Sequence, residues 1–444
     1  MKSLLGKEIA IVGAGFTGLT AAYKLSALGA KVTIFEAGEN AGGLAAGCTL
    51  LNEPIEKAYH FIYKTDKYML KLLKELNLDE SLTFHRSSVS TFIEGELYPM
   101  TNPFDLIRFS PLKLHNRIRL GLCVLYLQRI KKWQKLTKIT ALEWLNRFCG
   151  KEVTKVIWQP LLKGKFDHYF DKVTMAWLWG RIKQRADSQD RDLNGEALGY
   201  INGGFEKIVN ELIKRITDNK NCKILFNTTI ESINYDSNFD KNIIKYKNKS
   251  KEFNKVLLTV PCKVASKLLN DYRQVDPIYF EKLESINYLD AAILLFATDK
   301  PISDYYWHNI NSPDAPFVVF IGLTELIGNK RFKGKHVYYI GDYIPNDHLY
   351  MRCTEKELEK IWFDALEKMF PSFKRESVIE RKLFRFANAQ HIVDIDFEKK
   401  IVPFETPCKG VFLSNFSQIF PMDRGTNYAV RDGYRMAELF AKKG

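Results

Sequence analysis

The chain has 444 residues, a formal net charge of +14 and 46% hydrophobic residues. Its length is enough to bury two hydrophobic cores, and its composition is that of a globular protein. No apolar run reaches the roughly 18 residues that a membrane-spanning helix needs. The sequence has a basic excess but no nucleic-acid-binding motif, so no nucleic-acid partner is expected. The partners that a basic protein can still attract are an anionic substrate and an anionic membrane surface.

A glycine-rich turn follows the first predicted strand, Ile9 to Val12. It has the spacing Gly13-x-Gly15-x-x-Gly18, and residues at helical spacing follow it, namely Leu19, Ala22, Tyr23 and Leu25. A second predicted strand runs from Lys31 to Glu36 and so ends on an acid. This strand–turn–helix–strand order with a terminal acid predicts a dinucleotide-binding site.

Each part of this motif has a physical task. Gly13 permits the tight turn, Gly15 lets a pyrophosphate approach the backbone, and Gly18 lets the helix lie close to the strand. The helix that begins at Phe16 and Thr17 offers free amide groups to the phosphates. Glu36 is placed to accept hydrogen bonds from a ribose, and its charge disfavours NADP. A cleavable signal peptide would remove this turn, so none is expected.

A glycine pair follows in Ala41-Gly42-Gly43-Leu44, where the backbone can approach a ligand that extends past the pyrophosphate. This start resembles the FAD-binding segment of the amine oxidases, protoporphyrinogen oxidases, phytoene desaturases and UDP-galactopyranose mutase. The resemblance implies that FAD is the cofactor and that Gly42, Gly43 and Leu44 contact it. The seven cysteines include no CxxC pair, which predicts reduced thiols and no metal site.

Tyr59-His60 is similar to the histidine-bearing motif near the flavin of UDP-galactopyranose mutase. The resemblance places His60 beside the flavin, as a proton donor or as a polar wall, and the alternative is a packed histidine.

A basic amphipathic segment spans residues 106–142, with nine Lys or Arg residues and no acid. Such a segment can lie on an anionic membrane, or it can be a pair of helices with solvated charges. Further on, residues 157–185 resemble a bacterial protoporphyrinogen-oxidase-like subgroup. There Lys163, Lys165 and Arg181 are candidates to bind an anionic substrate group, with ordinary surface charge as the alternative. Trp177 and Trp179 cannot face the same side of a helix, so we expect one in the core and the other at a pocket.

Later segments return to the cofactor domain. In the resembling flavoproteins, the residue at Ile230 contacts the adenine through its backbone, and residues 255–261 match a strand of the same domain. A strand over residues 410–415 ends at Asn415, where the family more often has Gly-Asp. The turn Arg424-Gly425 then leads into a final helix with Thr426 as the predicted N-cap. The resemblance directs Gly425, Asn427, Tyr428 and Ala429 at the flavin, with Arg424 as a charge beside flavin or substrate.

The sequence therefore predicts an α/β protein with a GR2-type doubly wound FAD-binding Rossmann domain and an inserted mixed-sheet and helical substrate domain. The expected FAD-binding domain is discontinuous (residues 1–75, 196–265 and 396–444). Residues 76–195 form a helical substrate or membrane-contact region, and residues 266–395 a mixed-sheet substrate domain.

The resemblance implies an FAD-dependent oxidoreductase acting on an organic substrate that is hydrophobic, lipid-linked or sugar-linked. One alternative is a non-redox sugar mutase, and a second is an isoprenoid-binding protein on the same fold. We expect a cytoplasmic protein, with peripheral attachment to the inner face of the membrane as an open alternative.

Overall fold

The computed structural model describes residues 3–188, 195–312 and 314–443. Its α-helices are α1 (Phe16–Ala27), α2 (Lys67–Glu75), α3 (Pro103–Arg108), α4 (Leu114–Arg129), α5 (Ala141–Phe148), α6 (Lys151–Val153), α7 (Gln159–Phe166), α8 (Met175–Asp187), α9 (Glu206–Thr217), α10 (Cys262–Leu268), α11 (Pro277–Ser285), α12 (Leu323–Ile327), α13 (Glu355–Met369) and α14 (Thr426–Lys443).

The strands are β1 (Glu8–Val12), β2 (Lys31–Phe35), β3 (Gly47–Leu50), β4 (Glu53–Glu56), β5 (Ile62–Tyr63), β6 (Leu82–Arg86), β7 (Val89–Ile93), β8 (Glu96–Pro99), β9 (Ala197–Ile201), β10 (Lys223–Leu225), β11 (Ser232–Asp236), β12 (Lys241–Tyr246), β13 (Lys249–Phe253), β14 (Lys255–Leu258), β15 (Tyr288–Thr298), β16 (Trp307–Ile310), β17 (Val319–Gly322), β18 (His336–Ile344), β19 (Val378–His391) and β20 (Val411–Leu413).

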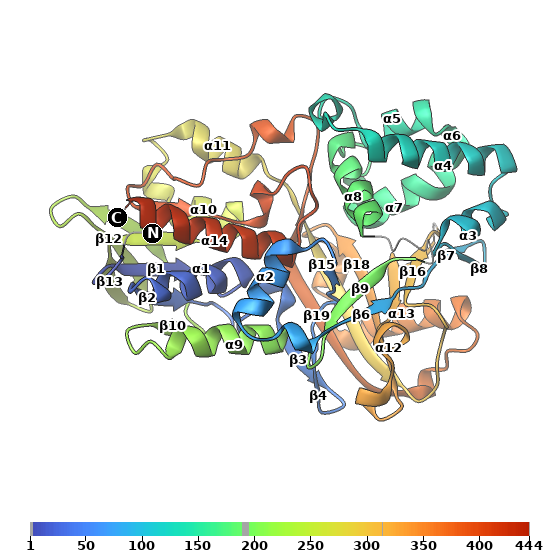
Figure 1. The fold of residues 1–444 in the computed structure, drawn as a ribbon, viewed down its shortest axis with the longest axis horizontal. Helices are drawn as coiled ribbons and strands as arrows, with labels where there is room; N and C mark the ends of the chain where they lie inside the picture. The colour runs from blue at the N-terminus through green and yellow to red at the C-terminus, as the bar shows by residue number, and fades with distance from the viewer. Residues whose placement is uncertain (1–2, 189–194, 313, 444) are drawn as a thin grey trace.

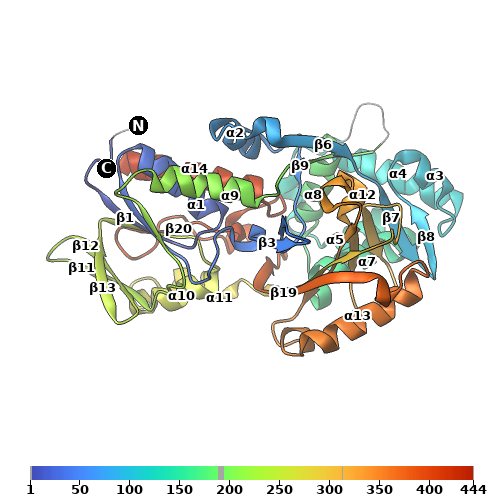
Figure 2. The ribbon, with the colours of Figure 1, turned by 90° about the horizontal axis from the view of Figure 1, so that it is seen from below.

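A five-stranded parallel sheet with the order β10-β2-β1-β14-β20 forms the lobe that holds both termini (Figure 1). Its strands are apolar on both faces, as buried parallel strands are, and Ile9 and Ile11 of β1 are fully buried. Figure 2 shows α1, α9 and α14 on one face of this sheet and β11–β13 with α10 and α11 on the other. This three-layer arrangement is the doubly wound α/β fold that the sequence predicts.

The second lobe contains a seven-stranded mixed sheet with the order β19-β15-β18-β17-β16-β7-β8, in which only β16 and β7 pair in parallel. Helix α13 packs on one face through Leu358, Trp362 and Phe363, which join a cluster with Phe296 and Tyr338 of the sheet. Helices α3 to α8 lie beyond the sheet as a separate helical layer (Figure 1).

The parallel sheet takes its strands from three separated parts of the chain. β1 and β2 come from residues 1–75, β10 and β14 from residues 196–265, and β20 from residues 396–444. The strand pair β7–β8 lies within residues 76–195 but joins the sheet of residues 266–395. The helical region therefore contributes two strands to the mixed sheet, and the proposed domain division remains a prediction.

Candidate cofactor and substrate site

The glycine turn after β1 is shaped by close packing at two of its three glycines. Gly13 has a positive φ of 106°, and a Cβ there would lie 2.5 Å from Thr259 Oγ1. A Cβ on Gly18 would lie 2.2 Å from the Gly13 carbonyl oxygen. Gly15 differs, because a Cβ there would meet no protein atom within 4 Å. The described structure thus keeps space in front of Gly15 that its own packing does not require, which fits a bound pyrophosphate.

Helix α1 begins at Phe16 with Gly15 as its N-cap, and no side chain caps its amide groups. Uncapped amides and the positive end of the helix dipole suit an anionic ligand. Phe16 is itself buried and makes an edge-to-face contact with Phe205, with ring centroids 6.3 Å apart. Phe16 and Thr17 therefore present their backbones at this end of α1, and their contacts with a cofactor remain predictions.

Glu36 joins the glycine turn to the end of β2. One carboxylate oxygen accepts a hydrogen bond from the Ala14 amide at 2.7 Å, and the other accepts one from the Gly38 amide at 2.8 Å. The Glu36 carbonyl accepts a hydrogen bond from the Thr228 amide at 2.8 Å, so Ile230 lies in the segment beside this residue. The structure therefore brings Glu36 and Ile230, the predicted ribose and adenine contacts, to one edge of the sheet. Their binding to a ligand remains a prediction.

The glycine pair folds back onto the first turn. The Gly42 amide donates to the Ala14 carbonyl at 2.8 Å, and a Cβ on Gly43 would lie 3.3 Å from the Gly15 Cα. Both residues have positive φ, at 110° and 59°, which glycine adopts without strain. Leu44 follows within the short 3-10 helix Gly43–Ala45. The pair is thus needed for backbone geometry as well as for any approach to a flavin.

Helix α14 lies along α1 (Figure 1). Gly433 permits this close packing, because a Cβ at this position would lie only 2.6 Å from Thr20 Cβ. The Gly425 carbonyl accepts from the Tyr428 and Ala429 amides, so the helix starts one residue earlier than the predicted Thr426 cap implies. A Cβ on Gly425 would meet no protein atom within 4 Å. This helix terminus is therefore open in the same way as that of α1.

Two predicted cofactor contacts use their side chains within the protein. Asn427 Oδ1 accepts hydrogen bonds from the Tyr68 and Met69 amides and so caps α2. Asn415 Oδ1 accepts from the Ser417 amide, and its Nδ2 donates to the Val260 carbonyl. Any cofactor contact by these two residues would have to share those hydrogen-bonding atoms or use the backbone.

His60 is held by its own chain segment. Its Nδ1 lies 2.8 Å from the Ala58 carbonyl oxygen, which can only accept, so Nδ1 carries the hydrogen and Nε2 is a free acceptor in the neutral ring. Burial and, to a smaller degree, the nearby Arg424 lower the pKa of His60 to about 4, although the hydrogen bond to Ala58 opposes this shift. At neutral pH the ring is uncharged, which favours the polar-wall interpretation over the proton donor.

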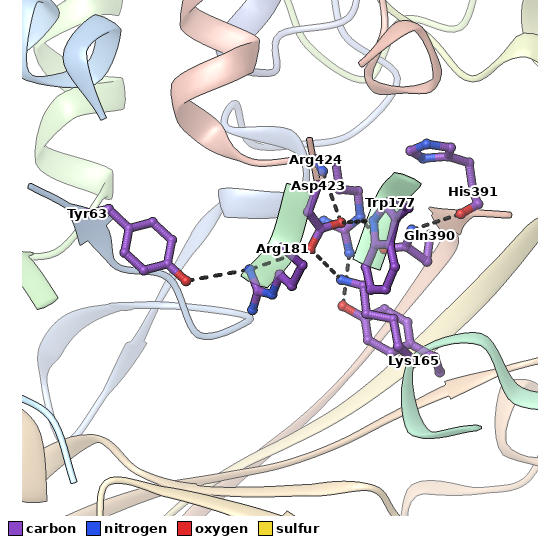
Figure 3. A network of polar contacts seen from close by, with 9 residues as sticks. Tyr63, Lys165, Trp177, Arg181, Gln390, His391, Asp423 and Arg424 are labelled. Carbon is purple, nitrogen blue, oxygen red and sulfur yellow. Dashed lines mark hydrogen bonds and ion pairs between the residues drawn. The ribbon is translucent and has the colours of Figure 1, made fainter. Parts of the chain in front are cut away.

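Figure 3 shows a polar network centred on Asp423, which brings together residues from distant segments. Asp423 Oδ2 lies 2.9 Å from Lys165 Nζ and 3.6 Å from Arg181 Nη1. Its Oδ1 accepts hydrogen bonds from the Trp177 indole at 3.3 Å and from the Arg424 amide at 3.0 Å. Helices α7 and α8 of the helical layer thereby meet the segment that leads into α14.

The cations of this network outnumber its carboxylate. Arg424 donates from Nε to Gln390 Oε1 and from Nη2 to the Tyr343 hydroxyl, and Arg181 Nη1 lies 3.5 Å from the Tyr63 hydroxyl. Burial alone would raise the pKa of Asp423, but Lys165, Arg181 and Arg424 outweigh it and hold that pKa well below its usual range.

The same surplus of positive charge acts on Tyr343. Burial opposes its ionisation, yet Arg424 and Lys165 lower the pKa of its hydroxyl. The side chains of Lys165 and Arg181 remain 21% and 26% exposed, so both can meet a ligand. We call Lys165, Arg181 and Arg424 with Asp423 the cationic cluster, and its chemistry suits the binding of an anion.

The sequence named Lys165, Arg181 and Arg424 separately and missed Asp423, the carboxylate that joins them. The sequence signal that could have identified Asp423 is its position next to Arg424. Lys163 lies apart from the cluster, with its ammonium over the Phe170 ring at 5.0 Å. We expected one tryptophan of α8 in the core and the other at a pocket, but both are buried. Their indole groups differ in partner, because Trp177 donates to Asp423 and Trp179 donates to the Leu127 carbonyl.

The parallel sheet, the glycine turn and the open helix termini define a doubly wound dinucleotide-binding protein. A sequence profile of the flavin containing amine oxidoreductases matches residues 16–389. The chain belongs to this flavin containing amine oxidoreductase family, whose members use a flavin cofactor.

The proteins that are similar to the chain include the following two curated relatives and one solved structure. Protoporphyrinogen oxidase 2 of Arabidopsis thaliana is 23% identical over 337 residues, which are 66% of this chain and 65% of the relative. Coproporphyrinogen III oxidase of Staphylococcus aureus is 25% identical over 334 residues, 67% of this chain and 69% of the relative.

The solved structure is that of a provisionally assigned protoporphyrinogen oxidase from Exiguobacterium sp. 255-15. It superposes with a TM-score of 0.79 at 16% identity and covers 99% of both chains, which shows the shared fold. The aligned region is slightly less than two thirds of the Arabidopsis relative. Among the residues that the structure describes, no helix is long and apolar enough to cross a membrane.

Proposed function

We propose that this protein is an FAD-dependent oxidoreductase whose organic substrate carries an anionic group. The observation that carries the cofactor assignment is the open space before Gly15, where the described protein places no atom within 4 Å of the position that a Cβ would occupy. Close packing requires the two neighbouring glycines and does not require this one, so the missing side chain of Gly15 serves a ligand.

The residues around this space fit FAD. The free amides at the start of α1 would hold the pyrophosphate, Glu36 would bind the ribose, and the start of α14 would face the flavin. When bound, FAD accepts a hydride or electrons from the substrate and passes them to an acceptor. The neutral His60 ring would contribute an uncharged acceptor atom at the site.

The cationic cluster supports the assignment of substrate charge. Lys165 carries a compact positive charge and donates a hydrogen bond to Asp423, while Arg181 contacts both Asp423 and the Tyr63 hydroxyl. Three cations with one carboxylate leave an excess of positive charge, which attracts carboxylate or phosphate groups and repels a protonated amine. Both curated relatives are named for porphyrinogens, which carry carboxylate side chains, so porphyrinogens are the first substrates to test.

The first experiment is the visible absorption spectrum of the purified protein, with mass analysis of the cofactor released by heat. A flavin spectrum with FAD as the released species supports the proposal. A protein that remains colourless after incubation with FAD would overturn it and bring forward the isoprenoid-binding alternative.

The substrate assignment is tested by anaerobic flavin reduction with coproporphyrinogen III, protoporphyrinogen and putrescine. We expect reduction by an anionic substrate and none by the amine. Arg181→Gln and Lys165→Met should each raise the KM for the anionic substrate by about tenfold or more, because a charged hydrogen bond contributes roughly 1.5–3 kcal/mol. Lys163→Met is the matched control and should leave KM unchanged, since Lys163 lies outside the cluster. Reduction by the amine alone would contradict the charge assignment.

The cationic cluster also fits the diphosphate of a nucleotide sugar, which keeps the non-redox mutase as a second candidate. A spectral shift of the reduced enzyme on addition of a nucleotide sugar, together with sugar isomerisation and no net oxidation, would favour it. Porphyrinogen oxidation without such a shift would exclude it.

A further inference from the structure

Two tyrosine hydroxyls border the cationic cluster, and each contacts one of its arginines. Arg424 Nη2 donates a hydrogen bond to the Tyr343 hydroxyl at 3.0 Å, and Arg181 Nη1 donates one to the Tyr63 hydroxyl at 3.5 Å, a contact that Figure 3 shows. A guanidinium group can only donate hydrogen bonds, so both phenol oxygens act as acceptors in these contacts. The O–H group of each tyrosine is therefore left for another partner.

Regular strands hold both tyrosines in place. Tyr63 ends β5, which pairs with β9, and its amide donates to Asp66 Oδ2 at 2.9 Å. Its side chain is only 4% exposed. Tyr343 lies near the end of β18, which pairs with the long strand β15. Side chains on paired strands are positioned before a ligand binds, which suits residues that select a ligand.

The acceptors of this polar network are already engaged. Asp423 Oδ1 accepts from two N–H groups, and its Oδ2 contacts Lys165 and Arg181. Gln390 Oε1 accepts from Arg424. Within the part of the chain that the structure describes, neither tyrosine hydroxyl donates a hydrogen bond to a protein acceptor. The network therefore offers more donors than acceptors, which suits a ligand that brings acceptor oxygens.

The electrostatic surroundings favour both O–H groups as donors to an anion. Burial raises the pKa of Tyr63, so its hydroxyl keeps its proton at neutral pH. At Tyr343, burial opposes ionisation, but Arg424 and Lys165 outweigh it and lower the pKa of the hydroxyl. A more acidic O–H group donates a stronger hydrogen bond. The Lys165 ammonium also lies 5.5 Å from the centre of the Tyr343 ring, so cation and hydroxyl act in one place.

We propose that Tyr63 and Tyr343 are specificity-determining residues that donate hydrogen bonds to the anionic group of the substrate. This inference rests on the proposed function, and it extends the anion site from the cationic cluster to two neutral donors on β5 and β18. A carboxylate or phosphate group has several acceptor oxygens, so it can accept from the hydroxyls as well as from the cations. A neutral ester lacks the charge, so the site should discriminate against it.

The test is the affinity of the purified holoprotein for coproporphyrin III and for its tetramethyl ester, measured by fluorescence quenching. Coproporphyrin III carries carboxylate groups and is already oxidised, so its binding is measured without flavin reduction. The wild-type protein should bind the free acid about tenfold or more tightly than the ester, because hydrogen bonds to charged groups are the stronger ones.

Single substitutions test the two hydroxyls. Tyr63→Phe and Tyr343→Phe should each weaken binding of the free acid by about tenfold, because each removes one hydrogen bond to a charged group. Both should change ester binding by about threefold or less, since an uncharged acceptor forms a weaker bond. The matched control is Tyr338→Phe on the same strand as Tyr343. Its buried hydroxyl accepts from the Ile302 amide in the core beside α13, so this variant should bind both ligands like the wild type.

A double variant separates direct donation from an effect that passes through the arginine. Tyr63→Phe in an Arg181→Met background should weaken binding of the free acid by a further factor of about ten, because a direct hydrogen bond does not need the arginine. An unchanged affinity in that background would show that Tyr63 only positions Arg181, which overturns the proposal.

Bound flavin and the melting temperature report whether each variant is folded. Unchanged binding of the free acid by both tyrosine variants, together with weaker binding by Arg181→Gln, overturns this proposal and leaves the proposed function in place. Equal wild-type affinity for acid and ester, or no binding of the acid, overturns both this proposal and the assignment of an anionic substrate.

Discussion

Asp423 shows how a single residue can decide the charge of a site. It is 4% exposed, and its carboxylate contacts Lys165, Trp177, Arg181 and the Arg424 amide. A buried carboxylate is stable only when its charge is compensated, and here three cations provide that compensation. The residue acts by positioning those cations, which themselves remain available to a ligand.

We predict that Asp423→Asn lowers the free energy of unfolding by about 2–4 kcal/mol, because the cations would lose their buried counter-charge. Denaturant unfolding at neutral pH measures this change. The depressed pKa of Asp423 means that its contribution is present above the ordinary aspartate pKa and is lost as the pH falls through the folded-state value, so the difference between wild type and variant should shrink in acid.

The control for this variant is Asp240→Asn, which breaks an exposed ion pair with Lys409 at 2.8 Å. Its stability should stay close to that of the wild type, because solvent screens such pairs. Equal effects of the two substitutions would show that the Asp423 contacts contribute no more than a surface pair.

At the scale of elements, we predict opposite effects of alanine at two glycines in the turn between β1 and α1. Gly15→Ala should fold with near-normal stability, because its φ of −75° suits alanine and no atom obstructs the new methyl group. It should lose FAD affinity by about tenfold or more, since that methyl group would occupy the pyrophosphate space.

Gly18→Ala should instead destabilise the apoprotein, because its Cβ would lie 2.2 Å from the Gly13 carbonyl oxygen. Overpacking of this kind costs about 1–3 kcal/mol. Melting of the apoprotein and titration with FAD separate the two effects. Normal FAD binding by Gly15→Ala would remove the main support for the cofactor site.

Helix α2 depends on a cap from the other end of the chain. Its own N-cap residue, Asp66, makes no capping side-chain bond, and Asn427 Oδ1 accepts from the Tyr68 and Met69 amides instead. Asn427→Ala should therefore lower the free energy of unfolding by about 1–2 kcal/mol, as loss of a helix cap does. Asn427→Asp retains the acceptor and should rescue stability. Failure of the aspartate to do so would indicate that the amide group has a further partner.

At the scale of the whole molecule, folding buries titratable groups whose pH effects oppose one another. Burial lowers the pKa of His391 to about 3, and its ring nitrogens have no hydrogen-bond partner in the described structure. Burial raises the pKa of Asp66 to about 7, although the Tyr63 amide partly offsets this. The histidine opposes folding in acid, because its buried ring must stay neutral while the unfolded ring is protonated. The carboxyl opposes folding as the pH rises toward 7, because it must stay protonated in the folded chain while it ionises in the unfolded chain.

We predict opposite pH trends for His391→Leu and Asp66→Asn. His391→Leu should gain stability relative to the wild type as the pH falls below the ordinary histidine value, by about 1.4 kcal/mol per pH unit. Asp66→Asn should gain relative to the wild type as the pH rises from the ordinary aspartate value toward 7, with a similar slope. Urea unfolding across this range measures both trends. A pH-independent difference for either variant would show that its group titrates alike in the folded and unfolded chains.

Local sequence determined the elements whose signals lie within a few residues. The glycine turn, the helix that follows it and the final helix were all predicted, because spacing, turn residues and apolar periodicity act over short distances. The fold class followed from the order of these elements and from the family resemblance. Periodicity predicted a basic amphipathic segment over residues 106–142 but not which apolar side chains stay exposed. Helix α4 leaves Leu122 and Leu125 exposed and buries Leu120, and only the packing of the helical layer decides this.

Only the tertiary structure shows which residues come together in the cationic cluster. Lys165, Arg181 and Asp423 are separated by as many as 258 residues, and no local pattern relates an ammonium on α7 to a carboxylate before α14. The same holds for Asn427, which the sequence directed to the cofactor and the structure shows capping α2. Such contacts arise where separate elements pack, so their partners are fixed by the arrangement of the whole chain, whereas turns and helices are fixed by their neighbours in sequence.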